Sequence, residues 1–256
     1  MPKLSNSCRL LYQIYNEDCF ETFKRIPNES IDLVLCDPPY GTTACKWDSV
    51  IPLDKMWEQL KRVIKPNGAI VMTASQPFTS NLITSNISMF KYCWVWEKSR
   101  ATNFPNAKKR PLTSHEDICV FMKCSIWYNP QKTEGHQPTN SAKGASQGRI
   151  YNGNNVRNYK GGDTTRFPRT VQRFDCERGL HPTQKPVALM EYLIKTYTNE
   201  NETVLDFTMG SGTTGVACMN LGRKFIGCDS DKEHGYFEIA KNRISEAYRM
   251  KAGQNA

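Results

Sequence analysis

The feature that most constrains the fold is a series of short apolar segments that alternate with helical patterns at both ends of the chain. Residues 31–36 are mostly aliphatic and stop at two consecutive prolines, while residues 52–64 place apolar side chains at helical spacing. Seven segments are predicted as strands: 11–15, 31–36, 69–72, 92–96, 118–122, 203–207 and 225–229. This alternation predicts an α/β fold with a mostly parallel, seven-stranded sheet.

Residues 125–178 interrupt this pattern. They are rich in Gly, Asn, Thr, Gln and Arg, poor in aliphatic residues, and without a convincing period. A segment of this length without its own periodicity predicts a lobe or loop carried by the sheet. We therefore expect one domain over residues 1–256, built from two halves (1–124 and 179–256) with the lobe (125–178) inserted between them.

The excess positive charge of the chain is concentrated in its middle third. The whole chain has 34 basic and 25 acidic residues, a formal charge of +9. Residues 98–178 hold 15 basic and 6 acidic residues, whereas the segments on either side are balanced. This asymmetry favours a polyanionic partner, with nucleic acid as the first candidate and a solvated basic surface as the alternative.

Composition also limits the location of the protein and its metal chemistry. No apolar run reaches the roughly 18 residues that a membrane span needs, and the first nine residues lack an apolar core. We therefore expect a cytoplasmic protein without membrane segments. Ten cysteines are present, but none forms a Cys-x-x-Cys pair, which predicts reduced thiols and no metal site.

A glycine turn follows the predicted strand 203–207. Gly210 and Gly212 allow a ligand to approach the backbone closely, and a helix beginning at Thr213 would present free N–H groups to it. Asp229 ends the next predicted strand, where a carboxylate can accept hydrogen bonds from ribose hydroxyls. The pattern lacks the third glycine of dinucleotide-binding turns and the lysine of phosphate-binding loops. It favours a nucleoside-containing cofactor over a simple tight turn.

A second turn, Asp37-Pro38-Pro39-Tyr40, follows the predicted strand 31–36. Prolines cannot continue a strand, so the turn lies at the strand's carboxyl end, where open α/β sheets bind ligands. A carboxylate and a carbonyl can accept both hydrogens of a flat amino group while an aromatic ring stacks on its π face. This combination suits the exocyclic amine of a nucleobase. The alternative is an ordinary turn that ends a strand.

Together these motifs resemble the S-adenosylmethionine-dependent amino-methyltransferases of DNA. The catalytic motif at 37–40 precedes the cofactor motif at 206–214, which is the order of the β group, and 181–186 (His-Pro-Thr-Gln-Lys-Pro) resembles its third hallmark. Residues 102–110, followed by His115-Glu116, are also typical. The resemblance implies a Rossmann-like methyltransferase fold, with a catalytic half at 1–124, a DNA-recognition lobe at 125–178 and a cofactor-binding half at 179–256.

The resemblance also implies the residues that bind S-adenosylmethionine. They are Asp18, Cys19, Asp37, Thr183, Lys185, Asp206, Phe207, Gly210, Ser211, Gly212, Thr213, Thr214 and Asp229. Ser211, Thr213 and Thr214 would hold the methionine carboxylate, with Thr183 and Lys185 on the same side. Asp18 would accept from the cofactor adenine, although it could equally cap the helix that follows. Thr208-Met209 departs from the family, in which many members carry Pro and a different small or apolar residue.

The catalytic residues implied are Asp37, Pro38, Pro39 and Tyr40. Asp37 and the Pro38 carbonyl would hold the amine of a base flipped out of the duplex, and Tyr40 would stack on it. Trp94 and Trp96 are weaker stacking candidates and fit a strand in the core better. The predicted DNA contacts are Lys98, Arg100, Lys108, Lys109, Arg110, Arg149, Arg157, Arg166 and Arg169.

The leading prediction is therefore a site-specific DNA methyltransferase that acts on the N6 amine of adenine. An N4-cytosine methyltransferase is the nearest alternative, because both bases expose an amine, while Asp before Pro-Pro-Tyr favours adenine within the family. A non-catalytic DNA-binding module is the alternative of another class, although the intact motifs argue against it. DNA is the expected partner. A homodimer and a cognate restriction enzyme are candidate partners for which the sequence holds no motif.

Overall fold

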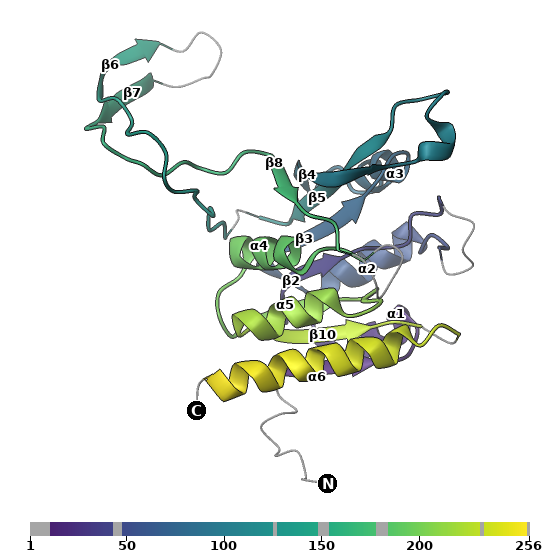
Figure 1. Cartoon of the computed structure of the whole chain (residues 1–256). Coiled ribbons are helices and arrows are strands. Elements are labelled where there is room, and N and C mark those ends of the chain that lie inside the picture. The colour runs from purple at the N-terminus through teal and green to yellow at the C-terminus, as the bar shows by residue number, and fades with distance from the viewer. Residues whose placement is uncertain are drawn as a thin grey trace. The chain divides into compact units, whose positions relative to one another are not determined.

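A computed structural model describes residues 11–42, 48–124, 127–147, 154–177, 184–230 and 233–254. The chain divides into two units (Figure 1). The first is formed by residues 1–129 and 170–256, and the second by residues 130–169. The second unit lies within the segment predicted as an insertion.

The strands of the described residues are β1 (Tyr12–Tyr15), β2 (Ile31–Cys36), β3 (Ile64–Ala74), β4 (Phe90–Thr102), β5 (Thr113–Met122), β6 (Ala142–Gln147), β7 (Asn154–Tyr159), β8 (Val171–Phe174), β9 (Thr203–Asp206) and β10 (Lys224–Cys228). The helices are α1 (Cys19–Arg25), α2 (Leu53–Val63), α3 (Phe78–Ser85), α4 (Val187–Tyr197), α5 (Thr213–Leu221) and α6 (Tyr236–Gln254), with a short 3₁₀ helix at Phe104–Asn106. No helix in these residues is long and apolar enough to cross a membrane.

The first unit contains a sheet in the order β1-β10-β9-β2-β3-β5-β4-β8. Strand β5 runs antiparallel to β3 and β4, and the other neighbours are parallel. The chain leaves β2 toward β3 and leaves β9 toward β10, in opposite directions along the sheet. The boundary between β2 and β9 is therefore a topological switch point, the place where such sheets bind ligands.

The predicted α/β fold with a mostly parallel sheet is confirmed, but the sheet has eight strands rather than seven. All seven predicted strands are present, and β8 is added at the edge beside β4. β8 has only four residues, Val-Gln-Arg-Phe, which alternate between exposed and half-buried. Because an edge strand of this kind lacks a continuous apolar run, the sequence pattern did not separate it from the insertion.

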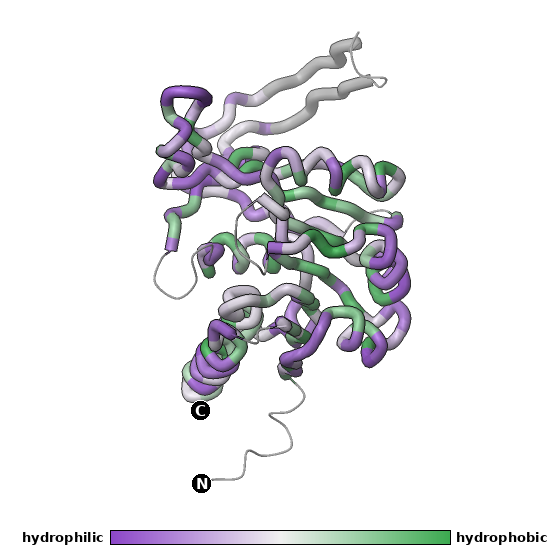
Figure 2. The backbone as a smooth tube through the Cα atoms, turned by 90° about the vertical axis from the view of Figure 1, so that its right-hand side faces the viewer, coloured by the Kyte–Doolittle hydropathy of each residue, from purple (hydrophilic) through white to green (hydrophobic). Residues whose placement is uncertain are grey.

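Helices cover both faces of the sheet. Strand β2 is buried along its whole length, as a central parallel strand must be. Its alternate side chains enter two different cores, with Leu33 and Leu35 packing beside α4, α5 and α6, and Val34 and Cys36 beside α1, α2 and α3. Figure 1 shows α4, α5 and α6 together on one face, and Figure 2 shows the apolar strands between more polar peripheral segments.

The second unit is built around the antiparallel hairpin of β6 and β7, whose register pairs Ala142 with Tyr159. Outside the hairpin, Thr133 and Arg166 form an antiparallel bridge. The Arg166 guanidinium donates to the carbonyl oxygens of Asp163 at 2.9 Å and Thr165 at 2.8 Å, and also to that of Gln137. Arg166 therefore helps to hold this unit together.

Candidate active site

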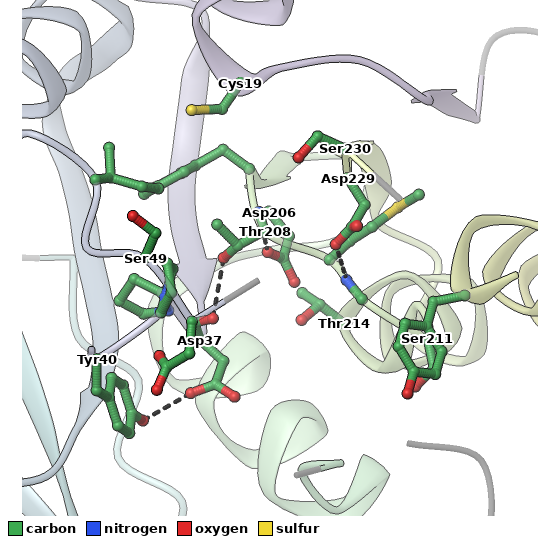
Figure 3. A pocket seen from close by; sticks show the side chains of 18 of the residues that line it. Cys19, Asp37, Tyr40, Ser49, Asp206, Thr208, Ser211, Thr214, Asp229 and Ser230 are labelled. Carbon is green, nitrogen blue, oxygen red and sulfur yellow. Dashed lines mark hydrogen bonds between the residues drawn. The ribbon is translucent and has the colours of Figure 1, made fainter. Parts of the chain in front are cut away.

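The two predicted turns meet because their strands are neighbours in the sheet. β2 and β9 are parallel and pair Leu33 with Val204, so Asp37 and Asp206 emerge at the same edge. Together with the segment before α1 they line a cleft of about 1030 Å³. In Figure 3, Asp37 and Tyr40 lie at one side of this pocket, Asp229 and Ser230 at the other, and Asp206 and Thr208 between them.

The Asp37 side chain is held from several directions. Its Oδ1 atom accepts hydrogen bonds from the Tyr40 hydroxyl at 2.7 Å and from the Thr73 hydroxyl. Its main-chain carbonyl accepts from the Thr208 hydroxyl at 3.1 Å. The turn that follows is fixed as well, because the buried Asp48 accepts from the main-chain N–H groups of Gly41 and Thr42.

Lys185 lies against this carboxylate and is only 6% exposed. Its Nζ atom is 2.6 Å from Oδ2 of Asp37 and 3.2 Å from Oε2 of Glu116. Burial alone would lower the pKa of Lys185, but the negative charges of Asp37 and Glu116 outweigh it and raise that pKa. Lys185 was predicted on the cofactor side of the site, whereas its described contacts are with Asp37 and Tyr40 of the catalytic turn and with Glu116 of β5.

Tyr40 is oriented by its ring as well as by its hydroxyl. The ring stacks on Phe78 with centroids 5.3 Å apart and planes at 23°. Burial, reinforced by the Asp37 charge, raises the pKa of Tyr40, so the phenol stays neutral and keeps its hydrogen. Trp94 and Trp96 lie in the core, as expected, with their indole N–H groups donating to Tyr197 and to the Phe174 carbonyl.

The glycine turn adopts the backbone that its sequence predicts. Gly210 has φ +48° and Gly212 has φ +78°, both in the left-handed region that favours glycine. A Cβ atom on Gly212 would also come within 2.8 Å of the Ala240 side chain on α6. The Gly210 N–H donates to Oδ2 of Asp229 at 2.8 Å, which fixes this carboxylate at the rim of the cleft.

Asp206 lies in the cleft with 3% of its surface exposed. It accepts a hydrogen bond from the Thr208 main-chain N–H at 3.1 Å. Burial raises the pKa of Asp206 to about 7, and the charges of Asp37 and Asp229 act in the same direction. A positively charged ligand beside this side chain would favour its ionised form.

The remaining predicted cofactor residues lie around the same cleft. Ser211, Thr213 and Thr214 are buried at its edge, and Arg243 of α6 donates to the Ser211 hydroxyl at 3.2 Å and approaches that of Thr213 at 3.4 Å. Arg243 was not predicted, because nothing in a helix pattern indicates which side chain reaches a distant turn.

Residues at the start of α1 and directly after β9 complete the lining. Phe207 is 2% exposed and packs on Phe23, while Cys19 is buried. Asp18 accepts the Phe20 N–H at 2.8 Å and so caps α1, the alternative that the sequence left open, while also lining the cleft. Thr183 lies outside the described residues.

The predicted DNA-binding residues all carry positive charge, but they differ in exposure and in their contacts. Arg100, Lys108, Lys109 and Arg110 are exposed on β4 and the β4–β5 connection, and Arg169 is exposed in the second unit. Lys98 is 11% exposed and paired with Glu116 at 2.5 Å, so its geometry does not support a phosphate contact. Arg166 donates to carbonyls of its own unit. Arg149 and the side chain of Arg157 lie outside the described residues.

Besides Arg243, four side chains at the site were not predicted: Asp48, Thr73, Glu116 and Thr208. Glu116 was noted only as typical of the family, and Thr208 only as a departure from it. Thr73 follows the predicted strand 69–72 directly, and nothing in the sequence indicates that its hydroxyl bonds to Asp37. In the described part of the chain, no three His, Cys, Asp or Glu side chains are grouped so that they could hold a metal ion.

The sequence profile of the DNA methylase family, which covers N6-adenine and N4-cytosine enzymes, matches residues 31–242. The chain belongs to this family. This confirms the predicted DNA methyltransferase, with DNA as its substrate and S-adenosylmethionine as its cofactor.

Individual relatives resemble the methyltransferase over almost its whole length. It is 30% identical to the DNA adenine methyltransferase YhdJ of Escherichia coli, over 95% of this chain and 86% of the relative. It is 29% identical to the Type II methyltransferase M2.LlaDCHI of Lactococcus lactis, over 91% of this chain and 89% of the relative. The crystal structure of M1.HpyAVI in complex with SAM has a TM-score of 0.63 and 29% identity, over 91% of this chain and 99% of that one. The predicted methyltransferase fold is thereby confirmed.

The cleft fits S-adenosylmethionine by the chemistry of the side chains that line it. Carboxylates suited to the positively charged parts of the cofactor and to its ribose lie at Asp206 and Asp229. Apolar walls suited to its adenine are offered by Phe20, Phe207 and Cys19. The residues of the chain and the cofactor of its family therefore agree.

Proposed function

We propose that the methyltransferase transfers a methyl group to the N6 amine of an adenine flipped out of DNA into the cleft beside Asp37. The observation that carries this proposal is the position of the Asp37 carboxylate, fixed by Tyr40, Thr73 and Lys185 at the edge shared with the glycine turn. A base within a duplex cannot enter such a cleft, so flipping costs a few kcal/mol before the reaction.

When bound, S-adenosylmethionine would supply the methyl group on a positively charged sulfur, and that sulfur would keep the electron pair of the broken C–S bond. The proton that the amine loses would pass to the Asp37 carboxylate or to water. Asp37 and the Pro38 carbonyl accept hydrogen bonds from the amine and hold its lone pair in line. The Asp37 carboxylate also stabilises the positive charge that develops on nitrogen. Tyr40 positions both the carboxylate and the base plane.

Adenine is proposed over cytosine for two reasons. Asp37 stands before Pro-Pro-Tyr, as in the adenine enzymes that the motif resembles, and one relative is named a DNA adenine methyltransferase. N4-methylation of cytosine is the alternative, because the family includes both reactions and the same acceptors would hold either amine.

DNA binding is proposed for the exposed basic residues of the β4–β5 connection and for the second unit, residues 130–169, as a target-recognition lobe. The support is the charge excess of residues 98–178 and the exposure of Lys108, Lys109 and Arg110. A cytoplasmic location, a homodimer and a cognate restriction enzyme stay predictions. The names of Type II relatives support the restriction partner, and light scattering on the purified protein tests the homodimer.

The function is tested by incubating the purified protein with tritiated S-adenosylmethionine and DNA, followed by analysis of the nucleosides. Label in N6-methyladenine is the expected result. Label in N4-methylcytosine would establish the alternative base, and DNA binding without label would establish a non-catalytic DNA-binding module.

A further inference from the structure

Behind the catalytic turn, charged side chains of alternating sign form a continuous row. Asp37 pairs with Lys185 at 2.6 Å, Lys185 with Glu116 at 3.2 Å, and Glu116 with Lys98 at 2.5 Å. Glu116 is 12% exposed and Lys98 11% exposed at their side chains, so solvent screens this row only weakly. Pairs that are buried in this way must be held in good geometry to offset the cost of desolvation.

The row follows the order of the strands. Asp37 comes directly after β2, Glu116 lies on β5 and Lys98 on β4, and these strands are linked through β3, which carries Thr73. The sheet thus fixes Asp37, Glu116 and Lys98, while Lys185 reaches them from the segment before α4. Lys185 is therefore positioned by two carboxylates on separate strands rather than by Asp37 alone.

The electrostatic consequence concerns the charge at Asp37. Positive charge develops on the attacking nitrogen during transfer, and a carboxylate stabilises it. An ammonium that faced Asp37 alone would oppose this effect, since it would neutralise the carboxylate. Glu116 offsets the ammonium of Lys185, and Lys98 lies one pair further from Asp37. The row of four charges is therefore neutral as a whole, but its negative end lies beside the amine.

We propose that Glu116 is a positioning residue of the methyltransferase, which acts through Lys185 to keep the Asp37 carboxylate in place and effectively negative during methyl transfer. This inference rests on the proposed function. Lys98 anchors Glu116 from its other side. Glu116 also lines the cleft, but its described ion pairs are with Lys185 and Lys98 rather than with Asp37.

The test compares Glu116→Gln with the control Glu97→Gln in single-turnover methyl transfer to DNA. Glu97 lies on β4 next to Lys98 and is exposed, so the control removes the same charge outside the row. Glu116→Gln is expected to slow transfer on the order of ten- to a hundredfold, less than the loss of a direct contact. The affinities for S-adenosylmethionine and DNA should stay close to those of the wild type, and Glu97→Gln should behave as the wild type.

Two further variants separate charge from folding. Glu116→Asp keeps the charge and should recover most of the rate. If Glu116→Gln does not fold, the double variant Glu116→Gln/Lys98→Met removes both partners of one buried pair, leaves no unpaired charge at Lys98, and should be slow as well. A rate for Glu116→Gln, or for the double variant, equal to that of Glu97→Gln would overturn the inference. A wild-type protein that transfers no methyl group would overturn the proposed function instead.

Discussion

The hydroxyl of Thr208 donates a hydrogen bond to the main-chain carbonyl of Asp37 over 3.1 Å, although the two residues are 171 positions apart. The bond connects the turn after β9 to the turn after β2, so the proposed cofactor and base sites are held at a fixed position relative to each other. It also gives a role to a residue at which the chain departs from the family pattern. Tyr40, Thr73 and Lys185 act on the side chain of Asp37, whereas this bond acts on its backbone.

Thr208→Val keeps the shape of the side chain and removes this donor. We expect methyl transfer to slow roughly two- to tenfold, since a neutral hydrogen bond contributes about 0.5–1.5 kcal/mol, with little change in cofactor affinity. Single-turnover kinetics measure the effect. Thr84→Val is the matched control, because Thr84 is exposed on α3 and bonds only within its helix. Equal rates for the two variants would show that the bond does not position Asp37.

The raised pKa of Asp206 predicts that cofactor binding depends on pH. Its pKa is raised to about 7 by burial, so a large part of the protein carries a neutral Asp206 below that pH. Binding of a positively charged cofactor favours the carboxylate and should release a proton. We expect affinity to increase up to about pH 7 and then to level off. Calorimetry in two buffers of different ionisation heat measures the released proton, and Asp206→Asn should abolish the release.

The same group affects the stability of the free protein. The folded-state pKa of Asp206 lies above the usual value of 3.8 for a free side chain, so the folded state binds more protons between these values. The contribution of Asp206 to the free energy of unfolding should therefore fall as the pH rises from about 4 to about 7. Denaturant melts of Asp206→Asn should lack that part of the fall, and a wild-type and variant pair with parallel pH profiles would contradict the assignment.

The two glycines of the cofactor turn should differ in their tolerance of alanine. Both have positive φ, a conformation that costs a non-glycine residue about 1–2 kcal/mol. Gly212→Ala must also displace Ala240, which adds about 1–3 kcal/mol, whereas a Cβ on Gly210 meets no atom within 4 Å. Chemical denaturation should therefore show a larger loss for Gly212→Ala. Equal losses would mean that α6 does not pack on the turn as described.

The basic residues of the β4–β5 connection should determine the salt dependence of DNA binding. Replacing Lys108, Lys109 and Arg110 by Gln is expected to reduce the slope of log affinity against log salt by up to roughly 0.9 per phosphate contact. The control replaces Lys55, Lys61 and Lys91 by Gln, which removes the same charge from exposed positions on α2 and at the start of β4. A similar change of slope in both variants would attribute the effect to net charge alone.

The sequence could predict those parts of the site that depend on neighbouring residues. A fully buried strand that ends at Asp37-Pro38 is a local pattern that indicates a turn at the strand's carboxyl end. A strand that runs into Gly210 and Gly212 indicates a glycine turn in the same way. The helix around Met56, Trp57 and Leu60 was predictable for the same reason, because its buried face follows from the spacing.

The contacts that complete the site could not be predicted, because they depend on the order of the strands. Glu116 comes near Asp37 only because β2, β3 and β5 are neighbours in the sheet, and Lys185 reaches both carboxylates from the segment before α4. Lys98 was assigned to DNA for a related reason: the chain gives its charge but not its burial. A single sequence carries no pairing information for residues so far apart.

Asp37→Ala removes the carboxylate that is proposed to hold the reacting amine. Methyl transfer by the variant is measured under single-turnover conditions, together with its calorimetric affinity for S-adenosylmethionine. We expect a rate at least 10²–10³-fold lower, roughly the loss for a direct transition-state contact, with cofactor affinity within about threefold of the wild type. A variant that transfers methyl groups to DNA at a rate close to that of the wild type would contradict this role of Asp37.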